Sequence, residues 1–205
     1  MANDTISYVA VGDSYTVGEG VDREETWPSL LTKHLQEEGL EIELTANVAR
    51  TGWLTQHVLE LQMPLFEKYQ PTFATLLIGA NDWVQEVSPE QFRTNFLAIV
   101  FRMQAVLPDK KKMVALTIPD FSVTRIGEIF GTGREVTTGI KEYNQVLTEV
   151  CLENSVSVVD IFPLSQGMKN DPDLVGLDGL HPSAKEYQLW EKEIFPVALE
   201  LLKEI

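Results

Sequence analysis

The sequence from Ile6 to Ser14 is ISYVAVGDS, and its pattern decides the class of fold. Residues 6–11 form a short apolar run with several β-branched side chains, which is typical of a strand buried on both faces. Gly12 follows directly, and a glycine there permits a sharp turn out of the strand. Beyond the turn, residues 27–38 carry apolar side chains along one helical stripe. A buried strand followed by a helix favours an α/β fold.

The same alternation continues along the rest of the chain. Further buried strands are predicted at residues 42–48, 73–78, 113–118 and 156–160. Further helices are predicted at residues 55–69, 89–106 and 139–153, with a last helix that begins after Ser183. Pro64 is expected to disturb the first of these, because proline cannot donate a helical hydrogen bond. Five apolar strands separated by helices imply a parallel sheet covered on both faces, in a single domain spanning residues 1–205.

Composition narrows the range of partners. The 31 acidic and 16 basic residues give a net charge of −15, a field that repels nucleic acids and anionic membrane surfaces. We therefore expect a small-molecule substrate, no nucleic-acid partner and no stable membrane insertion, and we leave a homo-oligomer open. The single cysteine, Cys151, excludes an internal disulfide. The first residues do not resemble a secretory signal, so the expected location is the cytoplasm.

Candidate catalytic residues follow the predicted strands. In open α/β sheets, ligands bind beyond the carboxyl ends of the strands, so chemistry is expected after residues 11, 48, 78 and 118. Ser14 lies just after the first strand, where a tight turn can project its hydroxyl into the crevice. Gly-Asp-Ser is also ordinary turn chemistry, so this serine alone is weak evidence for a nucleophile.

A partner for the serine lies near the end of the chain, in Asp178-Gly-Leu-His181-Pro182. A carboxylate three residues before a histidine can fold back to accept the Nδ1–H, which leaves Nε2 free to act as a base. Serine needs such a base, because its hydroxyl is a poor nucleophile until its proton is removed. The alternative is that His181 is only a loop residue ahead of the last helix.

Two other strand ends offer donors for an oxyanion hole. Gly52 comes after the second strand and Asn81 after the third. A tetrahedral oxyanion needs preorganised N–H groups, which the backbone of Gly52, the carboxamide of Asn81 and the N–H of Ser14 could supply. Each could also be only a turn residue, since Gly and Asn are common in turns.

Four blocks occur in order: Gly12-Asp13-Ser14, an Asn47…Gly52 segment, Gly79-x-Asn81-Asp82, and Asp178-x-x-His181-Pro182. Together they resemble the SGNH (GDSL) hydrolase family over nearly the whole chain. The resemblance implies a flavodoxin-like three-layer α/β/α sandwich and ester hydrolysis through an acyl-enzyme without a cofactor. It also implies Ser14 as nucleophile, Asp178 and His181 as its triad partners, and Ser14, Gly52 and Asn81 as oxyanion donors. The stretches 12–20 and 49–53 resemble a bacterial subgroup of esterases and lysophospholipase-like proteins.

Several neighbours of these blocks have two readings. Arg50 could meet a substrate carboxylate or phosphate, or it could tie down an acidic loop. Trp53 and Trp83 could wall an acyl pocket or pack in the core. Phe121 lies in residues 119–138, a stretch of little periodicity that we interpret as a mobile apolar flap, a short surface helix or a dimer contact.

The remaining titratable groups have simpler expected roles. Asp13 and Asp82 are expected to stabilise turns. His57 is the rival to His181 but lacks a carboxylate at a matching spacing, and His34 is expected to be inert. The three histidines and one cysteine show no metal-ligand spacing, and no phosphate-binding glycine motif occurs, so we expect no metal and no cofactor.

Three functions are compatible with these features. The first is hydrolysis of carboxylic esters or thioesters of short-to-medium acyl groups. The second is deacetylation of an acetylated sugar or another polar metabolite, because a triad specifies the bond that is cleaved and not the acyl or alcohol group on either side of it. The third is a binding module that keeps the fold without turnover.

Overall fold

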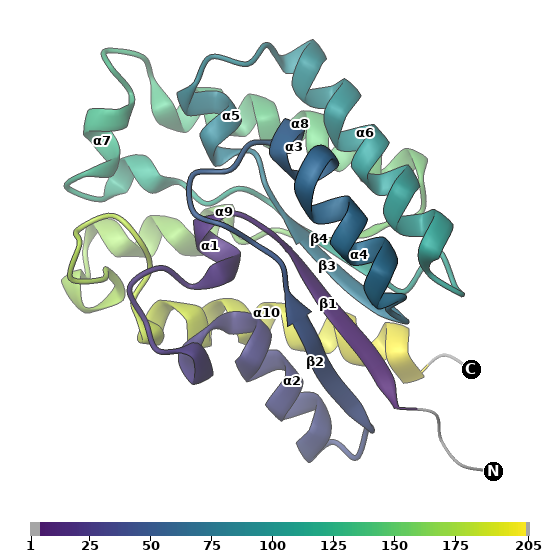
Figure 1. Cartoon of the computed structure of the whole chain (residues 1–205). Coiled ribbons are helices and arrows are strands. Elements are labelled where there is room, and N and C mark those ends of the chain that lie inside the picture. The colour runs from purple at the N-terminus through teal and green to yellow at the C-terminus, as the bar shows by residue number, and fades with distance from the viewer. Residues whose placement is uncertain (1–4, 204–205) are drawn as a thin grey trace.

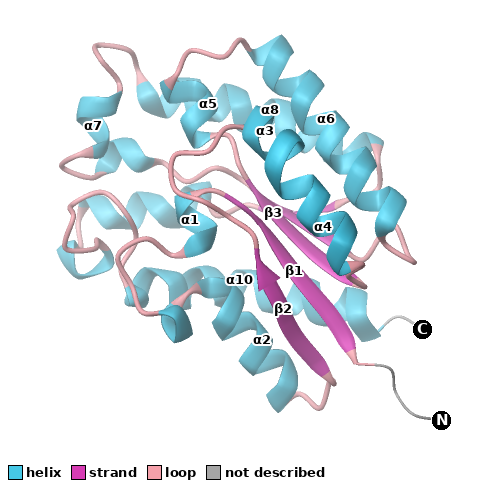
Figure 2. Cartoon of the chain, in the orientation of Figure 1, coloured by secondary structure: helices cyan, strands magenta, loops and turns pink. Residues whose placement is uncertain are grey.

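A parallel β-sheet forms the centre of the molecule in a computed structural model, which describes residues 5–203 (Figures 1 and 2). Its five strands lie in the order β2-β1-β3-β4-β5, and every pairing is parallel. The strands are β1 (Ile6–Gly12), β2 (Ile42–Asn47), β3 (Phe73–Leu77), β4 (Met113–Leu116) and β5 (Ser157–Val159). All five were predicted from their apolar runs, with ends that differ by one or two residues.

The strand order decides which helices cover which face. The chain steps from β1 to β2 in one direction, and then returns past β1 to β3, β4 and β5 in the other. Because parallel crossovers are right-handed, the two directions place their helices on opposite faces. Figure 1 shows α2 (Trp27–Glu37) with the last helix, α10 (Ala184–Lys203), on one face, and α4 (Met63–Tyr69), α6 (Pro89–Val106) and α8 (Val136–Glu153) on the other. The predicted α/β/α sandwich is confirmed.

Shorter helical elements fill the connections. They are α1 (Ser14–Val17), η1 (Arg23–Glu25), α3 (Thr55–His57), η2 (Val58–Gln62), α5 (Ala80–Val84), η3 (Phe121–Val123), α7 (Gly127–Phe130), α9 (Phe162–Ser165), η4 (Gln166–Lys169) and η5 (Pro172–Leu174). The expectation of little periodicity in residues 119–138 was incomplete, because η3, α7 and the start of α8 lie there. Such short turns bury too few residues on one face to leave a periodic pattern.

The predicted disturbance at Pro64 is confirmed. The segment 55–69 is a continuous helical stretch in which η2 is a π-helix between α3 and α4. The N–H of Met63 donates to the carbonyl of Val58, five residues back. Pro64 has no N–H to donate, so the wider turn before it accommodates a residue that an α-helix would leave unbonded.

Large aromatic side chains fill both layers of the core. Trp27, Tyr187 and Trp190 are fully buried on the α2 and α10 side, while Phe66, Phe92 and Phe96 are fully buried on the other. Burying an apolar side chain of this size contributes roughly 1.5–3 kcal/mol, so these two layers hold the sheet in place. Across residues 5–203, no helix combines the length and the apolar character needed to cross a bilayer.

Candidate active site

The turn that carries Ser14 is fixed by its neighbours. The side chain of Asp13 accepts a hydrogen bond from the N–H of Tyr15 (3.1 Å) and so caps α1. The Gln62 carboxamide holds both main-chain groups of Gly12, accepting from its N–H (3.0 Å) and donating to its carbonyl (2.7 Å). A Cβ at position 12 would lie 2.3 Å from the carbonyl oxygen of Leu77, so only glycine fits this turn. Ser14 is thereby placed at the carboxyl end of β1.

The three expected oxyanion donors come from adjacent strand ends. Ser14 is the first residue of α1, so its N–H has no acceptor within the helix. Gly52 lies in the loop after β2, with a φ of 79° that favours glycine. Asn81 is the second residue of α5, after β3, and its Nδ2 donates to the carbonyl of Trp53 (3.1 Å) and to Asp13 Oδ2 (3.4 Å). Because β2, β1 and β3 are neighbours in the sheet, their ends bring these three residues to one edge.

Asp178 and His181 form the expected pair. Asp178 Oδ2 lies 2.6 Å from His181 Nδ1. The other carboxylate oxygen accepts from the N–H groups of Leu180 (2.9 Å) and His181 (3.0 Å). Burial raises the pKa of Asp178, but the hydrogen bonds from the His181 side chain and the two N–H groups outweigh it and hold this pKa below its ordinary value. The carboxylate therefore stays charged and keeps the imidazole oriented.

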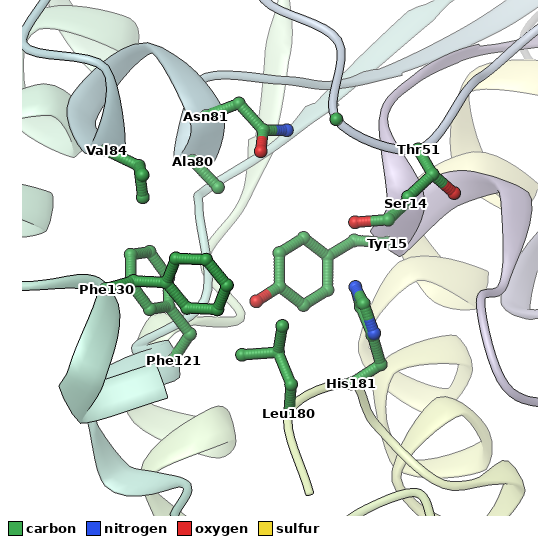
Figure 3. Close-up of a pocket in the computed structure, with 11 residues that line it drawn as sticks. Ser14, Tyr15, Thr51, Ala80, Asn81, Val84, Phe121, Phe130, Leu180 and His181 are labelled. Carbon is green, nitrogen blue, oxygen red and sulfur yellow. The ribbon is translucent and has the colours of Figure 1, made fainter. Parts of the chain in front are cut away.

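A cavity of about 300 Å³ joins these groups (Figure 3). The residues that line it are Ser14, Tyr15, Thr51, Gly52, Ala80, Asn81, Val84, Phe121, Phe130, Leu180 and His181. Figure 3 shows the Ser14 hydroxyl, the Asn81 carboxamide and the His181 imidazole facing the same space. The hydrogen bonds described for residues 5–203 do not include one between Ser14 and His181, a contact that commonly tightens only when substrate binds.

The comparisons with known proteins agree with this geometry. The model of the GDSL-like lipase/acylhydrolase family matches residues 10–189, which contain the Ser14 turn, the Asn81 segment and the Asp178–His181 pair. The chain belongs to the GDSL-like lipase/acylhydrolase family. It is thus a carboxylic ester hydrolase of the GDSL type.

Individual relatives are more distant. An arylesterase from Vibrio mimicus is 26% identical over 201 residues, which cover 96% of this chain and 88% of that protein. The crystal structure of TesA superposes with a TM-score of 0.77 at 22% identity, covering 95% of this chain and 99% of that one. A lipase/acylhydrolase from Enterococcus faecalis gives a TM-score of 0.76 at 23% identity, covering 96% of both chains. These two structural likenesses support the fold.

Buried carboxylates surround the site of this GDSL hydrolase. The pKa of Asp13 is raised to about 7. Burial is the main cause and the nearby Asp82 adds to the rise, while the hydrogen bond from the N–H of Tyr15 acts in the opposite direction. Burial also raises the pKa of Asp82, against hydrogen bonds from the hydroxyl and N–H of Thr55 that lower it. Asp82 thus ties the Asn81 segment to Thr55 at the start of α3, as expected of a turn-stabilising carboxylate. The link from Asp13 to the Asn81 carboxamide was not predicted.

Of the four expected lining residues, Phe121 lines the cavity, and the structure corrects the other three. Arg50 is exposed on the loop after β2, and Trp53 is half-buried against His57, with ring centroids 5.9 Å apart. Trp83 is buried behind Phe121, with ring centroids 6.2 Å apart. Their spacing after the strand ends does not fix the direction of their side chains.

Arg134 explains why Trp83 is a core residue. Its guanidinium lies 4.0 Å from the centroid of the Trp83 ring and donates to the carbonyls of Trp83 and Val84, both at 3.0 Å. This arginine therefore fastens α5 to the segment that precedes α8 and does not enter the cavity. The Trp83 side chain is held between Arg134 on one side and Phe121 on the other.

Sequence reasoning missed most of the cavity wall. Tyr15, Thr51, Ala80, Val84, Phe130 and Leu180 all line the cavity without having been assigned to it. Four of these residues adjoin Ser14, Gly52, Asn81 or His181 in the sequence, which is the signal that could have found them. Phe130 was noted only as part of the apolar stretch 119–138, and it reaches the cavity from the end of α7.

The other two histidines have structural partners. His57 Nδ1 accepts from the N–H of Leu54 (3.1 Å), at the start of α3. His34 pairs with Glu191 (3.0 Å) and stacks on Phe195, which joins α2 to α10. Neither residue lines the cavity, so His181 has no rival there. In the described part of the chain, no three side chains of His, Cys, Asp or Glu gather as metal ligands would.

Proposed function

We propose that this hydrolase cleaves carboxylic esters or thioesters of short-to-medium acyl groups through an acyl-enzyme. Ser14 is the nucleophile, His181 is the base and Asp178 orients the base. The N–H groups of Ser14 and Gly52 and the carboxamide of Asn81 form the oxyanion hole. The single observation that carries the proposal is one cavity lined by Ser14, Gly52, Asn81 and His181, with Asp178 hydrogen-bonded behind His181.

The reaction has two halves. In the first, Nε2 of His181 takes the Ser14 proton as Oγ attacks the ester carbonyl, and the oxyanion that forms is bound by the three donors. The imidazolium then protonates the leaving alcohol or thiol, and an acyl-serine remains. In the second half His181 removes a proton from water, the hydroxide attacks the acyl carbon, and the acid leaves as Ser14 regains its proton. The charged Asp178 stabilises the imidazolium in both halves.

The cavity lining favours an uncharged acyl group. Beyond the catalytic groups the wall consists of the apolar side chains of Ala80, Val84, Phe121, Phe130 and Leu180 together with Tyr15 and Thr51, and the lining residues include no lysine, arginine or carboxylate. Apolar walls of this kind gain from hydrocarbon contact. They offer few partners to the many hydroxyls of a sugar, so the apolar lining supports ester hydrolysis over sugar deacetylation.

Active-site labelling tests the proposal. A fluorophosphonate probe reacts with an activated serine, so it should label the wild-type chain but not Ser14→Ala. Ser29→Ala, on α2 away from the cavity, is the matched control and should label like wild type. Equal labelling of Ser14→Ala and wild type would disprove the assignment of the nucleophile.

Substrate rates then separate the remaining functions. Rates on p-nitrophenyl esters from acetate to decanoate, measured beside an acetylated sugar, should be highest for a short-to-medium acyl chain. A clear preference for the acetylated sugar would favour the deacetylase. Binding of esters without release of acid would favour a module that does not turn over.

A further inference from the structure

Tyr15 places a phenol in the active-site cavity. It is the second residue of α1, directly after Ser14, and its side chain is 4% exposed. Its ring packs edge-on against His181, with centroids 5.5 Å apart, and tilted against Trp190, with centroids 6.1 Å apart. Figure 3 shows the hydroxyl directed away from Ser14, towards the apolar part of the cavity near Leu180 and Phe130. The orientation of this side chain is therefore well determined by packing, and its polar end faces open space.

The Tyr15 hydroxyl has no hydrogen-bond partner among residues 5–203. The main chain of Tyr15 is engaged, since its N–H donates to Asp13 and its carbonyl accepts from the indole of Trp27 (3.0 Å). The hydroxyl takes part in none of the described hydrogen bonds, although a buried tyrosine normally finds a partner for it. Tyr8 shows the usual case, with its buried hydroxyl bonded to Thr75, and the Tyr143 hydroxyl donates to the carbonyl of Val87. The Tyr187 hydroxyl also lacks a partner, but Tyr187 is buried in the core and does not line the cavity, whereas Tyr15 does.

The chemistry of the surroundings decides what the hydroxyl can bind. Burial raises the pKa of Tyr15 well above its ordinary value, and the carboxylates of Asp13, Asp178 and Asp120 raise it further, so the phenol remains a neutral donor. The same carboxylates disfavour an anion at this place. A cation has no lone pair to accept the hydrogen bond. The fitting partner is an uncharged oxygen atom.

We propose that the Tyr15 hydroxyl recognises a neutral oxygen acceptor in the substrate, an ether, hydroxyl or carbonyl oxygen placed a few bonds from the scissile ester. The proposal rests on the proposed esterase function and adds a specificity determinant to it. The Tyr15 hydroxyl supplies a polar contact beside the apolar side chains of Phe130 and Leu180, so esters bearing such an oxygen are favoured over plain alkyl esters of the same length.

The test compares Tyr15→Phe with wild type on matched substrate pairs. For the acyl side the pair is p-nitrophenyl methoxyacetate and p-nitrophenyl butyrate, with methoxypropionate and valerate to move the oxygen by one bond. For the alcohol side the pair is 2-methoxyethyl butyrate and butyl butyrate. Each pair differs by one oxygen in place of one methylene group, and intrinsic ester reactivity cancels when the same ratio is measured in both proteins.

We expect the ratio of kcat/KM for the ether ester over the alkyl ester to fall about tenfold in Tyr15→Phe for one of the two sides, as loss of a hydrogen bond would give. Any loss that reaches both esters through the contact between the Tyr15 ring and His181 cancels in this ratio. The side that responds identifies whether the acyl or the alcohol part carries the oxygen. Tyr69→Phe, an exposed tyrosine at the end of α4, is the control and should leave every ratio unchanged.

The outcomes separate this inference from the function on which it rests. Unchanged ratios in a variant that still hydrolyses butyrate would overturn the recognition role and leave the esterase intact. An equal loss on both members of each pair would assign Tyr15 to packing and would also overturn it. If the wild-type chain hydrolysed none of these esters, the proposed esterase function would be contradicted, and not only the role of Tyr15. Tyr15→Leu, which also lacks the hydroxyl, is the second variant and should lower the ratio in the same way.

Discussion

The two halves of the proposed catalytic machinery are held in place by different means. The nucleophile turn, residues 12–16, is fixed by the core: Gln62 binds both main-chain groups of Gly12, and Asp13 is fully buried. The base loop, residues 175–182, is held mainly by itself, with Asp178 accepting from Leu180 and His181 and the N–H of Gly176 donating to the carbonyl of His181 (2.7 Å). Side-chain exposure follows the same division, since that of Asp178 is 39%.

The difference indicates which changes will damage stability and which will damage turnover alone. A substitution that crowds or breaks the buried contacts of Gly12 or Asp13 should lower the stability of the fold as well as turnover. A substitution in the base loop disturbs partly exposed contacts, so the fold should survive it. Three predictions examine this division, from the largest expected effect to the smallest.

The largest effect is expected for Asp178→Asn. The variant can no longer hold the imidazole in the reactive tautomer or stabilise its charged form, so kcat should fall on the order of 10⁴-fold. Because Asp178 is partly exposed, the melting temperature should change little. Steady-state kinetics and thermal unfolding measure the two quantities. Unchanged turnover would show that another group orients His181, and a large fall in melting temperature would contradict the division between the two regions.

The second prediction concerns pH and Asp13. Burial raises the pKa of Asp13 from 3.8 to about 7, so between these values the folded chain binds a proton that the unfolded chain has released. The free energy of unfolding should therefore fall as pH rises from about 4 to about 7, by up to about 4 kcal/mol from this group. Asp13→Asn should flatten that part of the profile.

Denaturant unfolding of wild type and Asp13→Asn across this range gives the measurement. Glu186, whose pKa burial also raises to about 7, contributes a slope of the same sign, so the difference between the two proteins isolates Asp13. Parallel profiles would mean that Asp13 is charged in the folded chain across the whole range. In the base loop the sign is opposite, because the lowered pKa of Asp178 gives stability that is lost as pH falls through its folded value.

The smallest effects come from a matched pair of glycines. A Cβ at Gly12 would lie 2.3 Å from the Leu77 carbonyl and 2.4 Å from the Thr16 hydroxyl, so Gly12→Ala should lower the free energy of unfolding by about 3 kcal/mol. A Cβ at Gly179 would lie 3.3 Å from Ile126, and its φ of 74° adds strain of only about 1 kcal/mol to Gly179→Ala.

Chemical denaturation of both variants tests this order, with Gly20→Ala as control. Gly20 has a φ of 87°, and a Cβ added there would have no atom within 4 Å, so Gly20→Ala measures the cost of backbone strain in the absence of any steric clash. Gly179→Ala should resemble the control in stability, and Gly12→Ala should not. Equal destabilisation by all three would show that crowding at Gly12, whose φ is not positive, costs no more than a positive φ does at the other two positions.

The fold could be predicted because it depends on local pattern. Buried parallel strands are continuous apolar runs, and each of the five stood out as one. That Ser14, Gly52 and Asn81 lie together could be predicted as well, because the strand ends of a parallel sheet meet at one edge. For the strands and for the residues at their ends, the position of a residue along its own strand was enough to make the prediction.

What could not be predicted depends on contacts between distant segments. The bond from Gln62 to Gly12 spans 50 residues, and no feature of either neighbourhood marks it. Trp83 turned out to be a core residue because Arg134, on a segment without periodicity, covers its ring. The direction of a side chain at a loop position is decided by such partners, so Arg50, Trp53 and Trp83 were assigned to a wall that other residues make.

The π-helical turn at Val58–Gln62 also has a consequence for the angular phase of the helix around it. A turn that holds one extra residue shifts everything beyond it by about 100° around the axis. Thr55, before this turn, reaches Asp82 after β3, while Gln62, at its end, reaches Gly12 at the end of β1. The irregularity acts as a spacer that lets one helix brace two separate strand ends. If the helix were shortened by one residue here, it would be more regular, but Thr55 and Gln62 could no longer reach Asp82 and Gly12 at the same time.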